Sequence, residues 1–373
     1  MPITDTSTTL LPAGHESWLA GLETDQPDAD IAAALAAIGE PTGIALRQTT
    51  SWEAGAYVES GENKDINAYA LEELAGGAEA LLFRLYQQPD VEDIATILKD
   101  IPLADVSLHC SLRYPGQDPA ELFRDLVRYL RKEGHDLATI SGSVDFDPLL
   151  DWSEPPFPPL VRLLYFVSRW MPEFRVLQVN AAGFNNGIGE ADSELALAIA
   201  KGSEYLKEVQ DKGYSIALAN GHLKFAFTVG TSFHGDVAKL RAFRILWAKV
   251  LESLGIENPP PANISAHTDI TTMQQDEVEN RTTLQLQALA ANLGGADLLF
   301  LAPAEGMHQA ATDTGRLLSR QVQMEARNAN SPANALKIDE AYLEDLTVAL
   351  VKAAWLSYKH IEDQGGFANA VEL

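Results

Sequence analysis

The sequence predicts an α/β fold, a closed (β/α)8 TIM barrel with an N-terminal arm and a C-terminal helical extension. Two observations point to this fold. From about residue 43 onward, short apolar, β-branched runs alternate with longer stretches of helical periodicity, as in a parallel sheet wound with helices. Eight such runs can be counted, and eight parallel strands close a barrel.

The expected strands are bounded by turn-forming residues. Gly76 and Gly77 precede the second run, Gly294 and Gly295 precede the eighth, and a triple proline starting at Pro259 precedes the seventh. The strands are expected at residues 44–48, 80–85, 105–111, 137–143, 175–180, 224–230, 263–267 and 297–301. Helices are expected near residues 66–74, 91–99, 119–132, 160–170, 190–212, 237–254 and 276–292. Each helix is long enough to connect two parallel strands.

Both ends of the chain depart from this alternation. Residues 1–40 form the arm, with two weak helices at 16–22 and 30–38, and residues 41–301 form the barrel. Residues 302–373 are expected to pack on the barrel as two long helices, 314–327 and 338–364.

Composition excludes several classes of partner. The 53 acidic and 27 basic residues give a formal charge of −26, whereas binding to nucleic acid or an anionic membrane needs a concentrated basic surface. No leader pattern begins the sequence, and no apolar run is long enough to span a bilayer. We therefore expect a cytoplasmic protein with neither nucleic acid nor membrane as a partner.

Cys110 is the only cysteine, so no intrachain disulfide and no thiolate metal cluster can form. It lies in an apolar run between Val106 and Leu112, which favours a buried core thiol over a nucleophile.

One long helix, expected from residue 237, carries apolar residues such as Leu240, Phe243 and Trp247 on one face. From the residues alone, its basic side chains predict a solvated face; they are Lys239, Arg241, Arg244 and Lys249. The whole segment, GTSFHGDVAKLRAFRILW at residues 230–247, resembles a signature of the methylmalonyl-CoA mutase barrel.

Further motifs in the same order strengthen that resemblance. They are Arg47-Gln48, Glu194-Leu195-Ala196 with Gly202 and Tyr205, Asn280-Arg281, Leu289 to Gly295, and His360 to Gly366. The resemblance implies the barrel fold and adenosylcobalamin-dependent isomerisation of a CoA thioester, in which the cofactor generates the radical.

The positions that carry catalysis in the family do not match. Thr49 stands where catalytic chains have a tyrosine, and Ala181-Ala182-Gly183 stands for their Gly-Tyr-His. Asp145 replaces an amide and Trp152 the arginine that binds the substrate carboxylate, so we expect repulsion of that carboxylate. The segment 38–42 lacks the family's residues that help to hold coenzyme A. No catalytic residue is expected.

No cofactor or metal site is expected in this chain either. The family binds cobalamin through an Asp-x-His-x-x-Gly motif in a second domain. In this chain His234 is preceded by Ser232 at the position where that motif requires aspartate. His109 and His267, at strand ends, are interpreted as core or rim residues. The other histidines are His15, His135, His222, His308 and His360.

The resemblance therefore implies the small, non-catalytic subunit of a heterodimeric methylmalonyl-CoA mutase. The larger catalytic chain would bind adenosylcobalamin, and the arm and terminal helices would contact it. One alternative is a free-standing acyl-CoA mutase barrel that works with a separate cobalamin-binding chain. Recruitment of the barrel to another function stays open.

Overall fold

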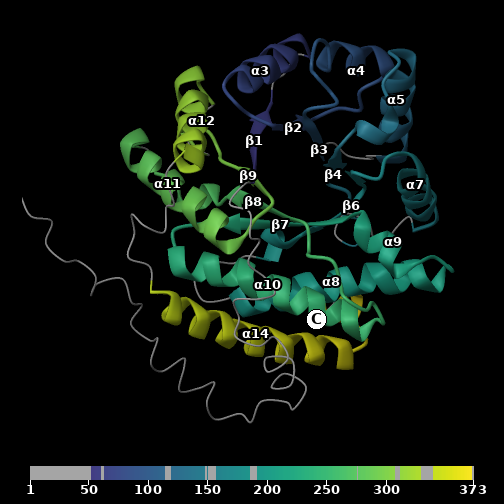
Figure 1. Cartoon of the computed structure of the whole chain (residues 1–373), viewed down its shortest axis with the longest axis vertical. Coiled ribbons are helices and arrows are strands. Elements are labelled where there is room, and N and C mark those ends of the chain that lie inside the picture. Colours follow the sequence, from purple (N-terminus) through teal and green to yellow (C-terminus); the bar gives the residue numbers. More distant parts are fainter. Residues whose placement is uncertain are drawn as a thin grey trace, which may run out of the picture.

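The expected barrel is confirmed by a computed structural model, in which helices surround a ring of strands (Figure 1). The structure describes residues 52–59, 63–113, 119–147, 149, 157–184, 191–274, 276–306, 311–328 and 339–371. The N-terminal arm and the strand expected at 44–48 lie outside these residues. All strand pairs are parallel, in the order β5-β4-β3-β2-β1-β9-β8-β7-β6.

Nine strand segments form the eight strands of the barrel. They are β1 (Glu53–Val58), β2 (Ala80–Leu85), β3 (Ser107–Leu112), β4 (Gly142–Val144), β5 (Phe174–Arg175), β6 (Leu177–Asn180), β7 (Leu223–Val229), β8 (Ile264–Thr268) and β9 (Leu298–Phe300). Only Val176 separates β5 from β6. β5 pairs with β4 and β6 pairs with β7, so the two segments act as one fifth strand, as the sequence predicted.

β1, which pairs with β2 on one side and β9 on the other, was not predicted from the sequence. Its Ala-Gly-Ala core has no β-branched residue, so the pattern is weak. Packing explains the small residues, because a Cβ on Gly55 would lie 2.4 Å from the Phe300 ring. The expected strand 137–143 was also partly wrong. Leu137–Thr139 form a 3-10 helix, η2, because Asp136 accepts a hydrogen bond from Ala138 N and caps it.

Helices alternate with the strands along the chain. They are α3 (Asn63–Ala75), α4 (Val91–Ile97), α5 (Pro119–Lys132), α7 (Phe157–Trp170), α8 (Ala191–Asp211), α9 (Ile216–Gly221), α10 (Phe233–Ser253), α11 (Glu277–Gly294), α12 (Asp313–Asn328), α14 (Glu340–Asp363) and α15 (Phe367–Val371), with short turns η3 (Ala181–Phe184) and η4 (Ile270–Thr272). α14 packs across the outer faces of α8 and α10 (Figure 1). In the parts of the chain that the structure describes, no helix has the length and hydrophobicity of a membrane span.

The solvated face predicted for α10 is wrong, because α10 lies between the strands and α14. Lys239, Arg241 and Arg244 are buried, whereas Lys249 is partly exposed. Buried cations need partners. Each of the three has them in the surrounding structure: Glu194, Thr228 O and, on α10 itself, Asp236 for Lys239; Glu340 and Leu293 O for Arg241; Asp297, Ala262 O and Gly295 O for Arg244. The predicted apolar residues Leu240, Phe243 and Trp247 are all buried.

The barrel closes at a seam between β4 and β6. Gln178 N donates to Phe146 O over 2.9 Å, and Asn180 N donates to the Asp147 carboxylate over 3.0 Å. Lys201 Nζ, from α8, lies 2.7 Å from that carboxylate, and the Tyr205 hydroxyl also donates to it. The Asp147 side chain thus replaces strand-to-strand hydrogen bonds and ties α8 to the seam.

We expect Lys201→Met to lower the free energy of unfolding by about 3–5 kcal/mol, because it leaves a buried carboxylate without its cation. Chemical denaturation monitored by circular dichroism measures the loss. Lys249→Met, at a partly exposed ion pair on α10, is the control and should change stability by less than about 0.5 kcal/mol. Adding Asp147→Asn to Lys201→Met should recover part of the loss. Equal stability of Lys201→Met and wild type would contradict the role of this pair.

Candidate functional site

A polar cavity of about 490 Å³ opens at the carboxyl ends of the barrel strands. In (β/α)8 barrels this end is where ligands bind. No site was predicted here from the sequence. The residues that line the cavity come from seven of the strands and the segments that follow them: Tyr57, Leu82, Arg84, Cys110, Ser111, Arg113, Ser143, Asp145, Gln178, Asn180, Ala182, Lys224, Ala226, Thr228, His267, Thr268, Asp269, Ile270 and Thr271.

Lys224, on β7, is the most deeply buried charge in the cavity wall, at 3% exposure. Its Nζ donates to Ser143 Oγ across the barrel over 2.9 Å. Burial lowers the pKa of the Lys224 ammonium to about 7, and the Asp145 carboxylate only partly offsets this effect.

Two arginines add positive charge nearer the mouth. Arg84 pairs with Glu59 over 3.1 Å and places its guanidinium 4.4 Å from the centre of the Tyr57 ring. Arg113 lies 4.0 Å from the Asp145 carboxylate with half of its side chain exposed. No motif predicted these cations, because Arg84 is a single charge within β2 and Arg113 directly follows β3.

Asp145 follows β4 at the cavity wall. Its carboxylate accepts from Ser111 Oγ at 2.6 Å and Leu112 N at 3.0 Å. Burial raises its pKa to about 6, against these hydrogen bonds and the Arg113 and Lys224 charges, which lower it. Among the described lining residues, three cations face two carboxylates, Asp145 and Asp269. The expected repulsion of an anionic ligand by Asp145 therefore does not follow from the charges in this structure.

Aromatic side chains pack beside the cavity, and Tyr57 and His267 also line it. The Tyr57 hydroxyl and His267 Nδ1 are 2.9 Å apart, and His267 Nε2 lies 3.0 Å from Ser265 Oγ. The Phe300 ring lies 5.1 Å from the His267 ring and 5.7 Å from the His109 ring, measured between centroids. Burial is the largest cause that lowers the pKa of both imidazoles, which keeps them neutral. Their interpretation as core or rim residues is confirmed.

The positions compared with the catalytic pattern fall in different places. Gly183 lies in η3, exposed, and a Cβ there would have no atom within 4 Å, whereas Ala182 lines the cavity. Burial raises the pKa of the Cys110 thiol to about 12, which fits a core thiol rather than a nucleophile. Thr49 and Trp152 lie outside the described residues.

Four of the described histidines are held by contacts within the fold that do not suit an axial cobalamin ligand. Both ring nitrogens of His267 are in hydrogen bonds, His222 Nδ1 lies 2.7 Å from Phe174 O, and His109 is enclosed by the barrel. His234, at the start of α10, packs edge-on against Tyr342. Within the described ranges, no three His, Cys, Asp or Glu side chains are grouped to hold a metal ion.

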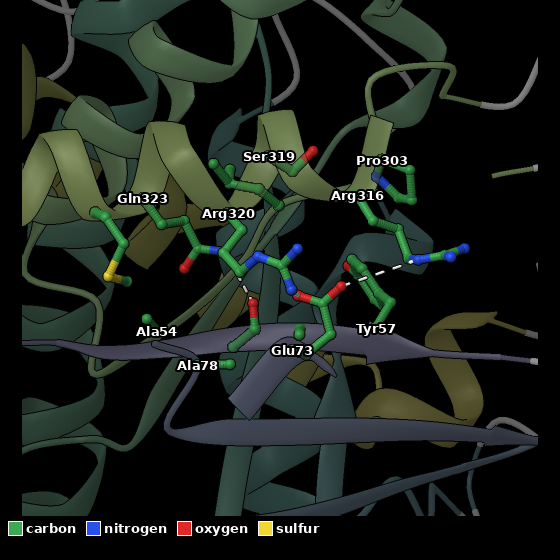
Figure 2. Close-up of a pocket in the computed structure, with 13 residues that line it drawn as sticks. Ala54, Tyr57, Glu73, Ala78, Pro303, Arg316, Ser319, Arg320 and Gln323 are labelled. Atoms are coloured by element: carbon green, nitrogen blue, oxygen red, sulfur yellow. Dashed lines mark hydrogen bonds and ion pairs between the residues drawn. The ribbon is translucent and has the colours of Figure 1, made fainter. Parts of the chain in front are cut away.

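A second, much smaller pocket of about 20 Å³ lies between α12 and β1 (Figure 2). Figure 2 shows Arg316 and Arg320 of α12 reaching toward Glu73 of α3, at 4.0 and 3.2 Å. Gln323 Nε2 donates to Gly55 O over 2.9 Å. Burial raises the pKa of Glu73 to about 7. This space holds about one water molecule, so these contacts join α12 to the first strand rather than form a ligand site.

Comparison with known proteins gives the class to which this fold and cavity belong. Residues 89–373 match the family model for methylmalonyl-CoA mutase, and the chain belongs to that family. The resemblance drawn from its motifs is thereby confirmed.

Individual relatives within this family include both small and large subunits of the enzyme. The methylmalonyl-CoA mutase small subunit of Porphyromonas gingivalis is 28% identical over 87% of this chain and 54% of its own length. A probable small subunit of Mycobacterium tuberculosis is 29% identical over 88% of this chain and 55% of its own length. The large subunit of P. gingivalis is 25% identical over 76% and 41%. The chain thus spans about half the length of the relatives it matches.

We expect Asp145→Asn to change how stability depends on pH. The native pKa of about 6 lies above the ordinary value of 3.8, so the native state binds more protons between those values and stability from this group falls as pH rises through them. The amide removes this dependence. Relative to wild type, the variant should therefore gain about 1 kcal/mol between pH 5 and pH 7.5.

Urea denaturation at the two pH values measures this gain. Asp313→Asn, at a carboxylate whose side chain is 85% exposed, controls for the loss of one negative charge. A constant difference between Asp145→Asn and wild type at both pH values would contradict the assignment.

Proposed function

We propose that this chain is the small, non-catalytic subunit of a heterodimeric methylmalonyl-CoA mutase. Its partner would be a larger chain of the same family, which binds adenosylcobalamin and converts methylmalonyl-CoA to succinyl-CoA. When bound there, the cofactor supplies the radical chemistry. The similarity to proteins named small subunit supports the choice of subunit.

The observation that carries the proposal is the lack of a histidine at the end of the fifth strand. Where the family's catalytic pattern has a histidine that donates to the thioester carbonyl, this chain has Gly183, exposed in η3 and without a side chain. His267 is the imidazole that lines the cavity, and Tyr57 and Ser265 already occupy both of its nitrogens. A preorganised donor at the developing charge is often the largest contribution to catalysis, so its loss argues against turnover.

One observation favours the alternative of a free-standing acyl-CoA mutase barrel with a separate cobalamin-binding chain. The cavity is retained, and Gln178 and Asn180 place amides in its wall from the fifth strand. An erased site would be expected to fill with apolar side chains. The following two experiments distinguish the proposals.

Co-expression with the larger chain should give one complex. We expect a single size-exclusion peak with a one-to-one ratio of the chains at micromolar concentration, because a subunit interface buries a large area. Light scattering gives the mass. An unrelated (β/α)8 barrel with the same tag is the control for non-specific association. Two separate peaks would count against the subunit proposal.

The second experiment measures activity directly. The wild-type chain is supplied with methylmalonyl-CoA, adenosylcobalamin and a cobalamin-binding partner that is itself inactive. It should form no succinyl-CoA. Gly183→His fits sterically because the position is open, yet it should remain inactive, since catalytic groups that act together are not restored by one member. Gly183→Ala is the matched control for folding. Turnover above background by the wild type would favour the free-standing barrel.

A further inference from the structure

The cavity wall contains two buried polar groups with unused hydrogen-bonding capacity. Lys224 has three donor hydrogens, and the contact that the structure gives it is Ser143 Oγ. Ser143 Oγ also lies 2.8 Å from His109 Nδ1, so it is shared. Among the described residues no carboxylate lies within ion-pair distance of the Lys224 ammonium. A lysine buried to this degree is ordinarily paired.

Gln178 stands beside Lys224, because the two residues are register partners in β6 and β7. Its side chain is 7% exposed and lines the same cavity. No hydrogen bond of its amide occurs within the described residues, although buried amides are nearly always bonded. Two neighbouring groups with spare donors therefore face one space.

The carboxylates near this space already have partners. Asp145 accepts from Ser111 and Leu112, and Asp269 accepts from Thr271 N over 3.0 Å as the cap of η4. Neither provides a direct counter-ion for Lys224. At the mouth, Arg113 adds a further cation.

We propose that this cavity binds a small organic anion, which places a carboxylate or phosphate group against Lys224 and Gln178 and a second anionic group toward Arg113. The volume suits a small ligand. Apolar wall atoms of Leu82, Cys110 and Ala226 can contact its carbon chain. This inference does not depend on the subunit role, because it concerns binding by this chain alone.

Protonation should be coupled to binding. The charged or titratable groups that act on Lys224 or feel its charge are Asp145, Arg175, Glu53, His109 and His267. Burial lowers the Lys224 pKa to about 7, and a bound anion favours the charged ammonium and raises that pKa. Binding at pH 8.5 should therefore take up a proton and be weaker than binding at pH 6.5.

Isothermal titration of the full chain with malonate, and separately with inorganic phosphate, tests the site at constant ionic strength. We expect saturable one-to-one binding of at least one of the two. Binding of malonate alone identifies a carboxylate ligand, and binding of phosphate alone identifies a phosphate ligand. Lys224→Met should weaken binding at least tenfold and abolish proton uptake. Gln178→Leu should weaken it less. Lys249→Met, at a partly exposed lysine outside the cavity, is the control and should bind as wild type.

Thermal unfolding shows whether Lys224→Met loses binding because it no longer folds. Methionine is similar in size to lysine and removes an unpaired buried charge, so Lys224→Met should unfold at the same temperature as wild type or higher. Malonate or phosphate should raise the wild-type unfolding temperature but not that of Lys224→Met. An equal rise with sodium chloride at matched ionic strength, unchanged affinity in Lys224→Met, or no saturable binding of either anion would overturn the proposal. Because no partner chain or cobalamin is present, failure here leaves the subunit proposal unaffected.

Discussion

A buried carboxylate, that of Asp147, holds together the weakest part of the barrel. β4 and β5 are only three and two residues long, so few main-chain hydrogen bonds are available to close the ring there. The carboxylate bonds Asn180 N, Lys201 and Tyr205, and thereby joins the end of β4, the end of β6 and α8. Lys201 is in turn covered by the rings of Phe184 and Phe367, whose centroids lie 5.4 and 5.3 Å from its Nζ. The charge is stable in the interior because every side of it is bonded or packed.

This closure also sets the geometry of the cavity. Asp145 lies two residues before Asp147, and Gln178 lies two residues before Asn180, so the seam fixes both cavity residues in place. Beside the cavity, the Phe300 ring packs against the neutral imidazoles of His109 and His267. The interior thus combines a packed aromatic group with a polar cavity. Polar groups kept without partners inside a fold reduce stability, and they commonly mark functional sites.

Long regular elements were predictable from the sequence, and short or tertiary-dependent ones were not. α5 begins and ends where its periodicity predicts, and β2 matches its expected bounds, because each has a strong local pattern. β1 was missed because its glycine, Gly55, is required by contact with the Phe300 ring, and Phe300 lies far away in the sequence. The burial of Lys239 and Arg241 also escaped, since periodicity on one helix cannot reveal α14 on its other side.

The cavity was missed for a related reason. Lys224 and Ser143 meet only because β4 and β7 face each other across the barrel, and no local motif records that contact. One signal was present in the printed sequence, a lysine within the otherwise apolar run LKFAFTV. A charged residue inside a strand that is buried on both faces is costly, and it could have marked the barrel interior as polar.

The pairing of β1 with β9 affects how the protein is made. Residues 53–55 bond to residues 298–300, so the ring cannot close until nearly the whole barrel has left the ribosome. Until then β1 and β8 present open strand edges, which are prone to pair with other chains. Folding that depends on contacts so distant in sequence is slow. The growing chain therefore exposes these edges for a long interval, during which chaperones can bind them.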